Sequence, residues 1–129
     1  MRVVADTNVV VRFLVADDAK QHLAVVRRLE AIRRAGGTVL LPTLVIAETS
    51  WVLATAYGRG RAEIQTAIGA LVRTAPFVAE DRPLVDAALA ENGPAGIADY
   101  LVLAYARREG AAVLSFDAKL LRESDVEKP

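Results

Sequence analysis

Arg2-Val3-Val4-Ala5-Asp6-Thr7-Asn8 opens the chain with a short apolar run that ends in a carboxylate and two small polar residues. An unbroken apolar run of this length predicts a strand buried on both faces, as in a parallel sheet packed between helices. The carboxyl ends of such strands form the edge at which α/β proteins bind ligands. Asp6 is therefore a candidate site residue, and the structural alternative is a turn residue or a cap for the following helix.

Further along, short apolar runs alternate with stretches of helical periodicity. The runs at 38–41, 77–79 and 112–116 predict three more strands, and residues 18–35, 43–57, 64–71, 81–92 and 99–109 predict the helices between them. This alternation is typical of βαβ units with a parallel sheet. We therefore expect a single α/β domain over residues 1–129, a three-layer α/β/α sandwich with a central parallel sheet.

Composition narrows the class of protein. The 129 residues are 53% hydrophobic and 25% charged, which is typical of a globular domain, and the absence of cysteine excludes disulfides and cysteine-bound metals. Sixteen basic and sixteen acidic side chains cancel, which argues against nucleic-acid binding by bulk charge but permits an enzyme that contacts a few phosphates. No run approaches the ~20 apolar residues of a membrane span or forms a signal peptide, so we expect a cytoplasmic protein.

Glu48 is the most informative acid after Asp6. The residues four and three before it, and three and four after it, are all apolar, so the pattern predicts a carboxylate on a core-facing helix stripe. An unpaired carboxylate there is costly and needs a partner. The alternatives are a position at the edge of the stripe or an ion pair with Arg12 or Arg73; the functional reading is that Glu48 points into a site.

Two further acids complete the set. Asp99 shares its helix face with apolar residues, although an aspartate at a helix start is also a common cap. Asp117 ends the predicted strand at 112–116, as Asp6 ends the first, and its structural alternative is a turn. Carboxylates that share one partly apolar pocket repel one another, so a cluster of four makes physical sense mainly around divalent cations such as Mg²⁺ or Mn²⁺. Such a site suits hydrolysis of phosphodiester bonds.

These residues resemble the PIN-domain ribonucleases, specifically the VapC-type toxins of toxin–antitoxin systems. The resemblance is carried by Asp6-Thr7-Asn8, Val45-Ile46-Ala47-Glu48, Ile97-Ala98-Asp99-Tyr100 and Ser115-Phe116-Asp117. It implies cleavage of RNA with Mg²⁺ or Mn²⁺, a homodimer, and neutralisation by a small antitoxin protein.

The resemblance also assigns positions. It implies that the first and fourth strands are neighbours, so that Asp6 and Asp117 lie together where strand order reverses, and it assigns Asn8 and Ser115 to the orientation of ligands or water. The last strand of the family has little support here, because residues 123–129 offer few apolar side chains beyond Val126. We expect that edge strand to be short or absent.

Two other functions fit less well. A phosphoacceptor receiver module is also an α/β protein of this size, but it needs an aspartate at the end of its middle strand and a lysine after its last strand. Glu80-Asp81 and Lys128 are the best candidates, and no helix follows Lys128. A PIN fold used only for binding is the third hypothesis, and retention of all four acids argues against it.

Overall fold

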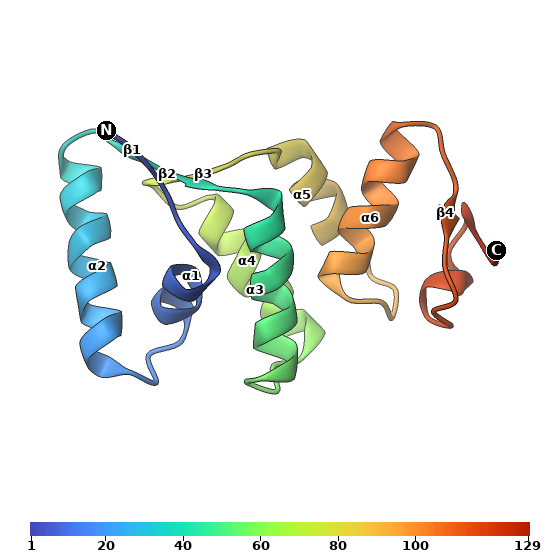
Figure 1. Ribbon diagram of the computed structural model, residues 1–129, viewed down its shortest axis with the longest axis horizontal. Coiled ribbons are helices and arrows are strands. Elements are labelled where there is room, and N and C mark those ends of the chain that lie inside the picture. The colour runs from blue at the N-terminus through green and yellow to red at the C-terminus, as the bar shows by residue number, and fades with distance from the viewer.

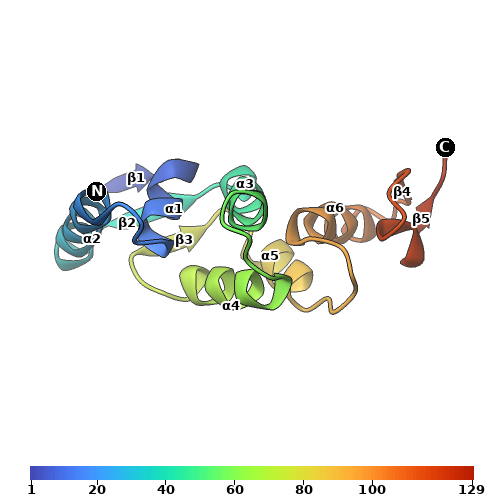
Figure 2. The same cartoon turned by 90° about the horizontal axis from the view of Figure 1, so that it is seen from below.

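The computed structural model describes residues 1–129 as an α/β protein in which every strand pair is parallel. Figures 1 and 2 show an elongated molecule with β1–β3 toward one end and β4–β5 at the other. In chain order the elements are β1 Arg2–Val4, α1 Thr7–Leu14, α2 Ala19–Arg34, β2 Thr38–Leu41, α3 Thr43–Thr55, α4 Arg61–Val72, β3 Phe77–Ala79, α5 Arg82–Leu89, α6 Ile97–Arg108, β4 Val113–Leu114, the 3₁₀ helix η1 Leu120–Arg122 and β5 Val126–Glu127.

Local signals in the sequence explain where several helices begin and end. Asp18 caps α2, because its carboxylate accepts a hydrogen bond from the Gln21 amide at 3.0 Å, and Gly36 ends that helix with φ of +71°. Asp81 caps α5 by accepting from the Leu84 amide at 3.2 Å. These short-range bonds satisfy amides that the first turn of a helix leaves free. The predicted helices are confirmed, with ends that shift by a few residues.

The central sheet has the order β1-β2-β3 and is parallel throughout. Val39, Leu41 and Phe77 point from it into the main hydrophobic core, where they are buried with side chains of the surrounding helices. In Figure 1 the helices α1, α2, α3 and α4 lie below these strands. The predicted α/β class with a central parallel sheet is confirmed.

The other face of this sheet is open to solvent. The register pairs Val4 with Leu40 and Leu40 with Val78, so that these three side chains form one row across the strands. Val4 is 64% exposed and Val78 is 44% exposed, and Leu40 is partly buried. Parallel sheets are ordinarily covered on both faces, so an exposed row of this kind is unusual for a parallel sheet.

β4 lies away from the central sheet, and here the prediction that the first and fourth strands are neighbours is wrong. β4 pairs with β5, whereas β1 pairs with β2 alone. The cause is the path of the chain: α6 packs against α3 and α5, and β4 follows a left-handed turn at Gly110 beyond the far end of α6. Figure 2 shows β4 and β5 on the side of α6 opposite to β1. The last strand, which we expected to be short or absent, forms over two residues.

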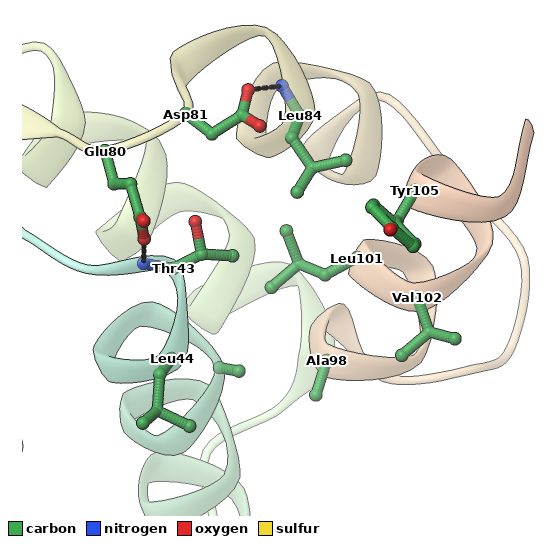
Figure 3. A pocket seen from close by; sticks show the side chains of 10 residues that line it. Thr43, Leu44, Glu80, Asp81, Leu84, Ala98, Leu101, Val102 and Tyr105 are labelled. Carbon is green, nitrogen blue, oxygen red and sulfur yellow. Dashed lines mark hydrogen bonds between the residues drawn. The ribbon is translucent and has the colours of Figure 1, made fainter. Parts of the chain in front are cut away.

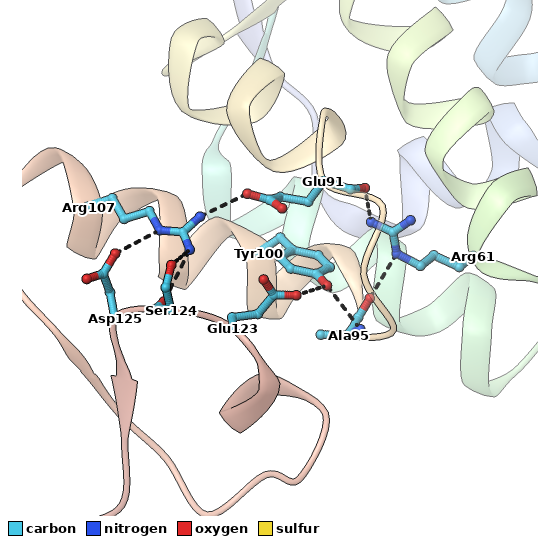
Figure 4. Close-up of polar contacts among 8 residues, drawn as sticks. All are labelled: Arg61, Glu91, Ala95, Tyr100, Arg107, Glu123, Ser124 and Asp125. Atoms are coloured by element: carbon cyan, nitrogen blue, oxygen red, sulfur yellow. Dashed lines mark hydrogen bonds and ion pairs between the residues drawn. The ribbon is translucent and has the colours of Figure 1, made fainter.

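Residues 113–129, which we call the C-terminal arm, are fastened to α6 by polar side chains (Figure 4). The Tyr100 hydroxyl donates to the Glu123 carboxylate at 2.9 Å. Arg107 pairs with Asp125 at 3.3 Å and donates to both oxygens of Ser124. Burial raises the pKa of the Tyr100 hydroxyl, and the hydrogen bond to Glu123 acts in the same direction. The arm is therefore held in a defined position on α6.

The ion pair between Asp81 and Arg108 makes the α5–α6 unit sensitive to acid. Arg108 donates to the Asp81 carboxylate at 2.6 Å and holds the pKa of this group below its usual 3.8. A carboxylate with a lowered folded-state pKa contributes stability above its unfolded-state pKa, and the contribution is lost as pH falls through the folded-state value. We expect Asp81→Asn, which keeps a capping side chain, to melt at a lower temperature than wild type at pH 7. Below pH 4 the difference in melting temperature between the two proteins should become smaller. Thermal unfolding followed by circular dichroism from pH 7 to below pH 4 measures both melting temperatures, and a difference that does not change with pH would contradict the role of this ion pair.

No helix of the structure combines the length and the apolar character that a membrane crossing requires.

Candidate functional site

Asp6 occupies the position that the sequence predicts, at the carboxyl end of β1 and directly before α1. It stands at the N-cap of α1, yet its side chain makes no capping hydrogen bond and is exposed. The cap function that offered a structural explanation for this aspartate is therefore not realised. Asn8, in the first turn of α1, is exposed as well.

Glu48 is exposed, and the prediction that it lies on a core-facing stripe is wrong. The helix face is apolar, but Leu44 and Trp51 on that face are themselves open to solvent. The Glu48 carboxylate accepts a hydrogen bond from the buried Thr7 hydroxyl at 3.3 Å. Because Thr7 follows Asp6 directly, this bond joins the middle of α3 to the Asp6 turn. The alternative ion pairs of Glu48 do not form, since Arg12 contacts Asp17 and Tyr57 instead.

Asp99 lies in the first turn of α6, where it accepts a hydrogen bond from the Gly96 amide at 3.3 Å. The structural explanation, a residue that caps its own helix, therefore holds for this side chain. Asp99 also lines a cavity of about 290 Å³ together with Trp51, Arg59 and Lys119. Arg59 pairs with Glu63 at 3.6 Å across an exposed surface, a contact that contributes little to stability.

Asp117 lies in the C-terminal arm, after β4. Its carboxylate accepts hydrogen bonds from the amides of Lys119 and Leu120 at 2.9 and 3.0 Å, and its own amide donates to the Ser115 hydroxyl at 2.9 Å. Both side chains thus shape the turn that leads into η1. The prediction that Asp117 shares the sheet edge of Asp6 is wrong for a single chain, because β4 does not pair with β1.

The contacts of the four acids connect them as two groups. Asp6 and Glu48 are linked through Thr7, whereas Asp99 lies in the cavity that Lys119 reaches from the turn after Asp117. No three acidic or histidine side chains of the chain approach closely enough to bind one metal ion. Carboxylate oxygens suit a hard cation such as Mg²⁺, but those of one chain in this conformation do not surround one.

The largest groove lies elsewhere, between the starts of α3 and α5 and one face of α6 (Figure 3). It measures about 690 Å³ and is lined mainly by apolar side chains, including Leu44, Leu101 and Tyr105. At its rim Glu80 accepts a hydrogen bond from the Thr43 amide at 2.8 Å. None of the four candidate acids lines this groove, so its size alone does not identify it as the catalytic site.

Sequence reasoning placed Thr7 at the polar rim of the site but did not predict its burial or its bond to Glu48, which depend on the packing of α1 on α3. It missed Lys119. Lys119 approaches Asp99 because the arm folds back along α6. Its position two residues after a candidate acid was the one signal available in the sequence.

Comparison with known proteins identifies the fold family. No curated protein matches the chain. Among solved structures, the Mycobacterium tuberculosis toxin VapC20, which cleaves the sarcin-ricin loop, aligns over 100% of both chains at 21% identity with a TM-score of 0.45. That score is too low to transfer any property. The model of the PIN domain, by contrast, matches residues 3–125, nearly the whole chain, and the chain belongs to the PIN-domain family.

Proposed function

We propose that this chain is a VapC-type endoribonuclease toxin, which hydrolyses phosphodiester bonds of RNA with Mg²⁺ or Mn²⁺ and is neutralised by an antitoxin protein. Membership of the PIN-domain family and the motifs around the four acids support this assignment. The observation that carries it is Asp6, an exposed carboxylate at the ligand-binding edge of a parallel sheet that caps nothing. A negative charge without a structural partner at such an edge is available for a ligand.

The choice of cation follows from the available donors. The chain has no cysteine, and its single histidine, His22, contacts the Arg12 carbonyl at 2.8 Å and belongs to no cluster of metal-binding side chains. Carboxylate oxygens remain, and these favour Mg²⁺ and Mn²⁺ over softer metals. A bound divalent cation makes water more acidic and stabilises charge on a phosphate.

RNA as the substrate is supported by the cavity beside Asp99. Trp51 is an exposed aromatic side chain on one wall, and Arg59 and Lys119 bring positive charge to the same cavity. Single-stranded RNA is bound by this combination of base stacking and contacts to phosphate. A net charge of zero suits local contacts of this kind rather than strong binding along a whole strand.

Of the two rival functions, the receiver module and the PIN fold that only binds, one can be set aside. Membership of the PIN-domain family excludes the receiver module. A PIN fold that only binds RNA predicts association without cleavage, so one assay separates it from the nuclease.

Incubation of the purified chain with labelled RNA tests the proposal. We expect cleavage with Mg²⁺ or Mn²⁺, complete loss of cleavage with EDTA, and recovery when excess Mg²⁺ is returned, because carboxylate sites release such ions to a chelator. RNA bound but intact under all three conditions would support the binding protein instead. RNA cleavage that survives EDTA would contradict a metal-dependent mechanism.

A further inference from the structure

Two strand edges in the chain are open, and they lie at opposite ends of the molecule. β1 pairs with β2 on one side, where the Ala5 amide donates to the Leu40 carbonyl at 3.0 Å, and no strand pairs with its other side. β4 pairs with β5 through the amides of Val113 and Ser115, and its other side is also free. Each open edge presents backbone groups that another strand can pair with.

Apolar side chains accompany both open edges. Val4 on β1 belongs to the exposed row that crosses the central sheet. On the arm, Leu114 is 66% exposed and Phe116 is 78% exposed. A two-residue parallel ladder such as β4–β5 is too short to be stable by itself, and each apolar surface lacks a covering layer.

The arm does not reach β1 of its own chain in this arrangement. It is fastened to α6 by Tyr100 and Arg107, as Figure 4 shows, and α6 is itself anchored by buried side chains such as Leu101 and Leu103. Moving β4 to its own β1 would break the contacts of Tyr100 and Arg107 that hold the arm on α6. A second copy meets no such obstacle. Because the two open edges lie toward opposite ends of the chain (Figure 2), two copies related by a two-fold axis satisfy both strand pairs at once.

We propose that two copies of the chain exchange their C-terminal arms, so that β4 of each copy pairs in parallel with β1 of the other. The product is a five-stranded parallel sheet in each half of the dimer, in the order β3-β2-β1 followed by β4 and β5 of the second copy. Exchange places Leu114 beside β1 of the other copy and extends the sheet at the edge that carries Val4.

The exchange also explains why Asp6 and Glu48 lack a third acid beside them in a single chain. This consequence rests on the proposed function. Both β1 and β4 lead into an aspartate, so parallel pairing brings Asp117 of the second copy to the sheet edge that carries Asp6. Asp6 and Glu48 of one chain and Asp117 of the other then lie at one edge. The metal site of the nuclease is shared between the two copies, and one copy alone does not complete it.

Cross-linking tests the exchange without reference to activity. The chain has no cysteine, so Val4→Cys and Leu114→Cys in one chain create a unique pair for a short bismaleimide. We expect a covalent dimer on denaturing gels, in which peptide mass spectrometry finds position 4 of one chain linked to position 114 of the other. A cross-linked monomer shows closure within one chain and overturns the proposal, as does the absence of any link. Ala62→Cys with Leu114→Cys is the control, because Ala62 lies on α4, which packs on the β3 side of the sheet, and it should give no dimer.

Mixed dimers test the shared site. Asp6→Asn and Asp117→Asn chains with different tags are co-expressed, and dimers that carry both tags are isolated. Each variant alone should be inactive, whereas the mixed dimer retains one complete site and about half of the wild-type RNA cleavage. An inactive mixed dimer beside an active wild type overturns the shared site. If the wild-type chain itself leaves RNA intact, the proposed function fails, and the cross-link still decides the exchange.

Discussion

We expect Asp6→Asn to remove most of the RNA cleavage while leaving the fold intact. Asparagine keeps the size of the side chain but removes the negative charge that a divalent cation requires. Metal-dependent stabilisation is worth several kcal/mol and each 1.4 kcal/mol is tenfold in rate, so we expect a loss of about a hundredfold to ten-thousandfold. The initial rate of cleavage of a labelled RNA, at saturating Mg²⁺, measures this effect.

The structure supplies the controls for this variant. Because the Asp6 side chain caps nothing, the variant should melt within a few degrees of wild type. Asp17→Asn is the matched control: Asp17 is another exposed aspartate, paired with Arg12 at 3.4 Å, and it belongs to neither group of candidate acids. Its removal should leave cleavage unchanged. Equal losses in both variants would mean that a general effect of charge, rather than the position of Asp6, controls activity.

Leu41→Ala should strongly destabilise the fold. Leu41 is 0% exposed and lies on the central strand β2, between β1 and β3, with its side chain in the main core. Truncation of a buried leucine removes apolar burial and leaves a cavity, which costs about 2–5 kcal/mol. Such a loss is a large share of the stability of a single domain. Equilibrium unfolding in urea measures the change in free energy.

Leu44→Ala is the control for Leu41→Ala, because it removes the same atoms from an exposed position. Leu44 lies three positions later, in the first turn of α3, and is 68% exposed. We expect its truncation to change the free energy of unfolding by no more than about 0.5 kcal/mol at concentrations where the chain is monomeric. Similar costs for the two leucines would mean that the core is not where the structure places it.

The helices and the first three strands were predictable because their signals are local. Asp18 and Asp81 mark helix starts through bonds that span three residues, and Gly36 marks an end because it adopts a positive φ. The apolar runs predicted as strands at 38–41 and 77–79 form β2 and β3 with the same first and last residues. Signals of this range require no knowledge of how the elements pack.

What packs against each element was not predictable in the same way. Periodicity identified an apolar face on α3, but it could not show that Leu44 and Trp51 would remain exposed, so Glu48 was wrongly placed toward the core. The position of β4 was missed for a related reason. The strand predicted at 112–116 forms only over Val113–Leu114, and Asp117 follows it by three residues. Which strand lies beside β4 depends on the path of α6 and on contacts such as Tyr100 with Glu123.

The candidate acids show the same difference between what local sequence predicts and what packing decides. Asp6 lies where its strand predicts it, while Asp99 and Asp117 both make the local hydrogen bonds of a cap or a turn. Such bonds leave room for a second function, because a carboxylate has two oxygens with several lone pairs. The roles of Asn8 and Ser115 in orienting ligands stay predictions.

Mapping the ends of cleaved RNA is the most direct test of the nuclease assignment. One RNA is incubated with the wild-type chain in Mg²⁺, with the wild-type chain in EDTA, and with Asp6→Asn in Mg²⁺, and the new 5′ ends are located by primer extension. We predict discrete new ends in the first reaction and none in the other two. Identical ends in all three reactions would contradict the assignment, because the cleavage would then depend on neither the metal nor Asp6.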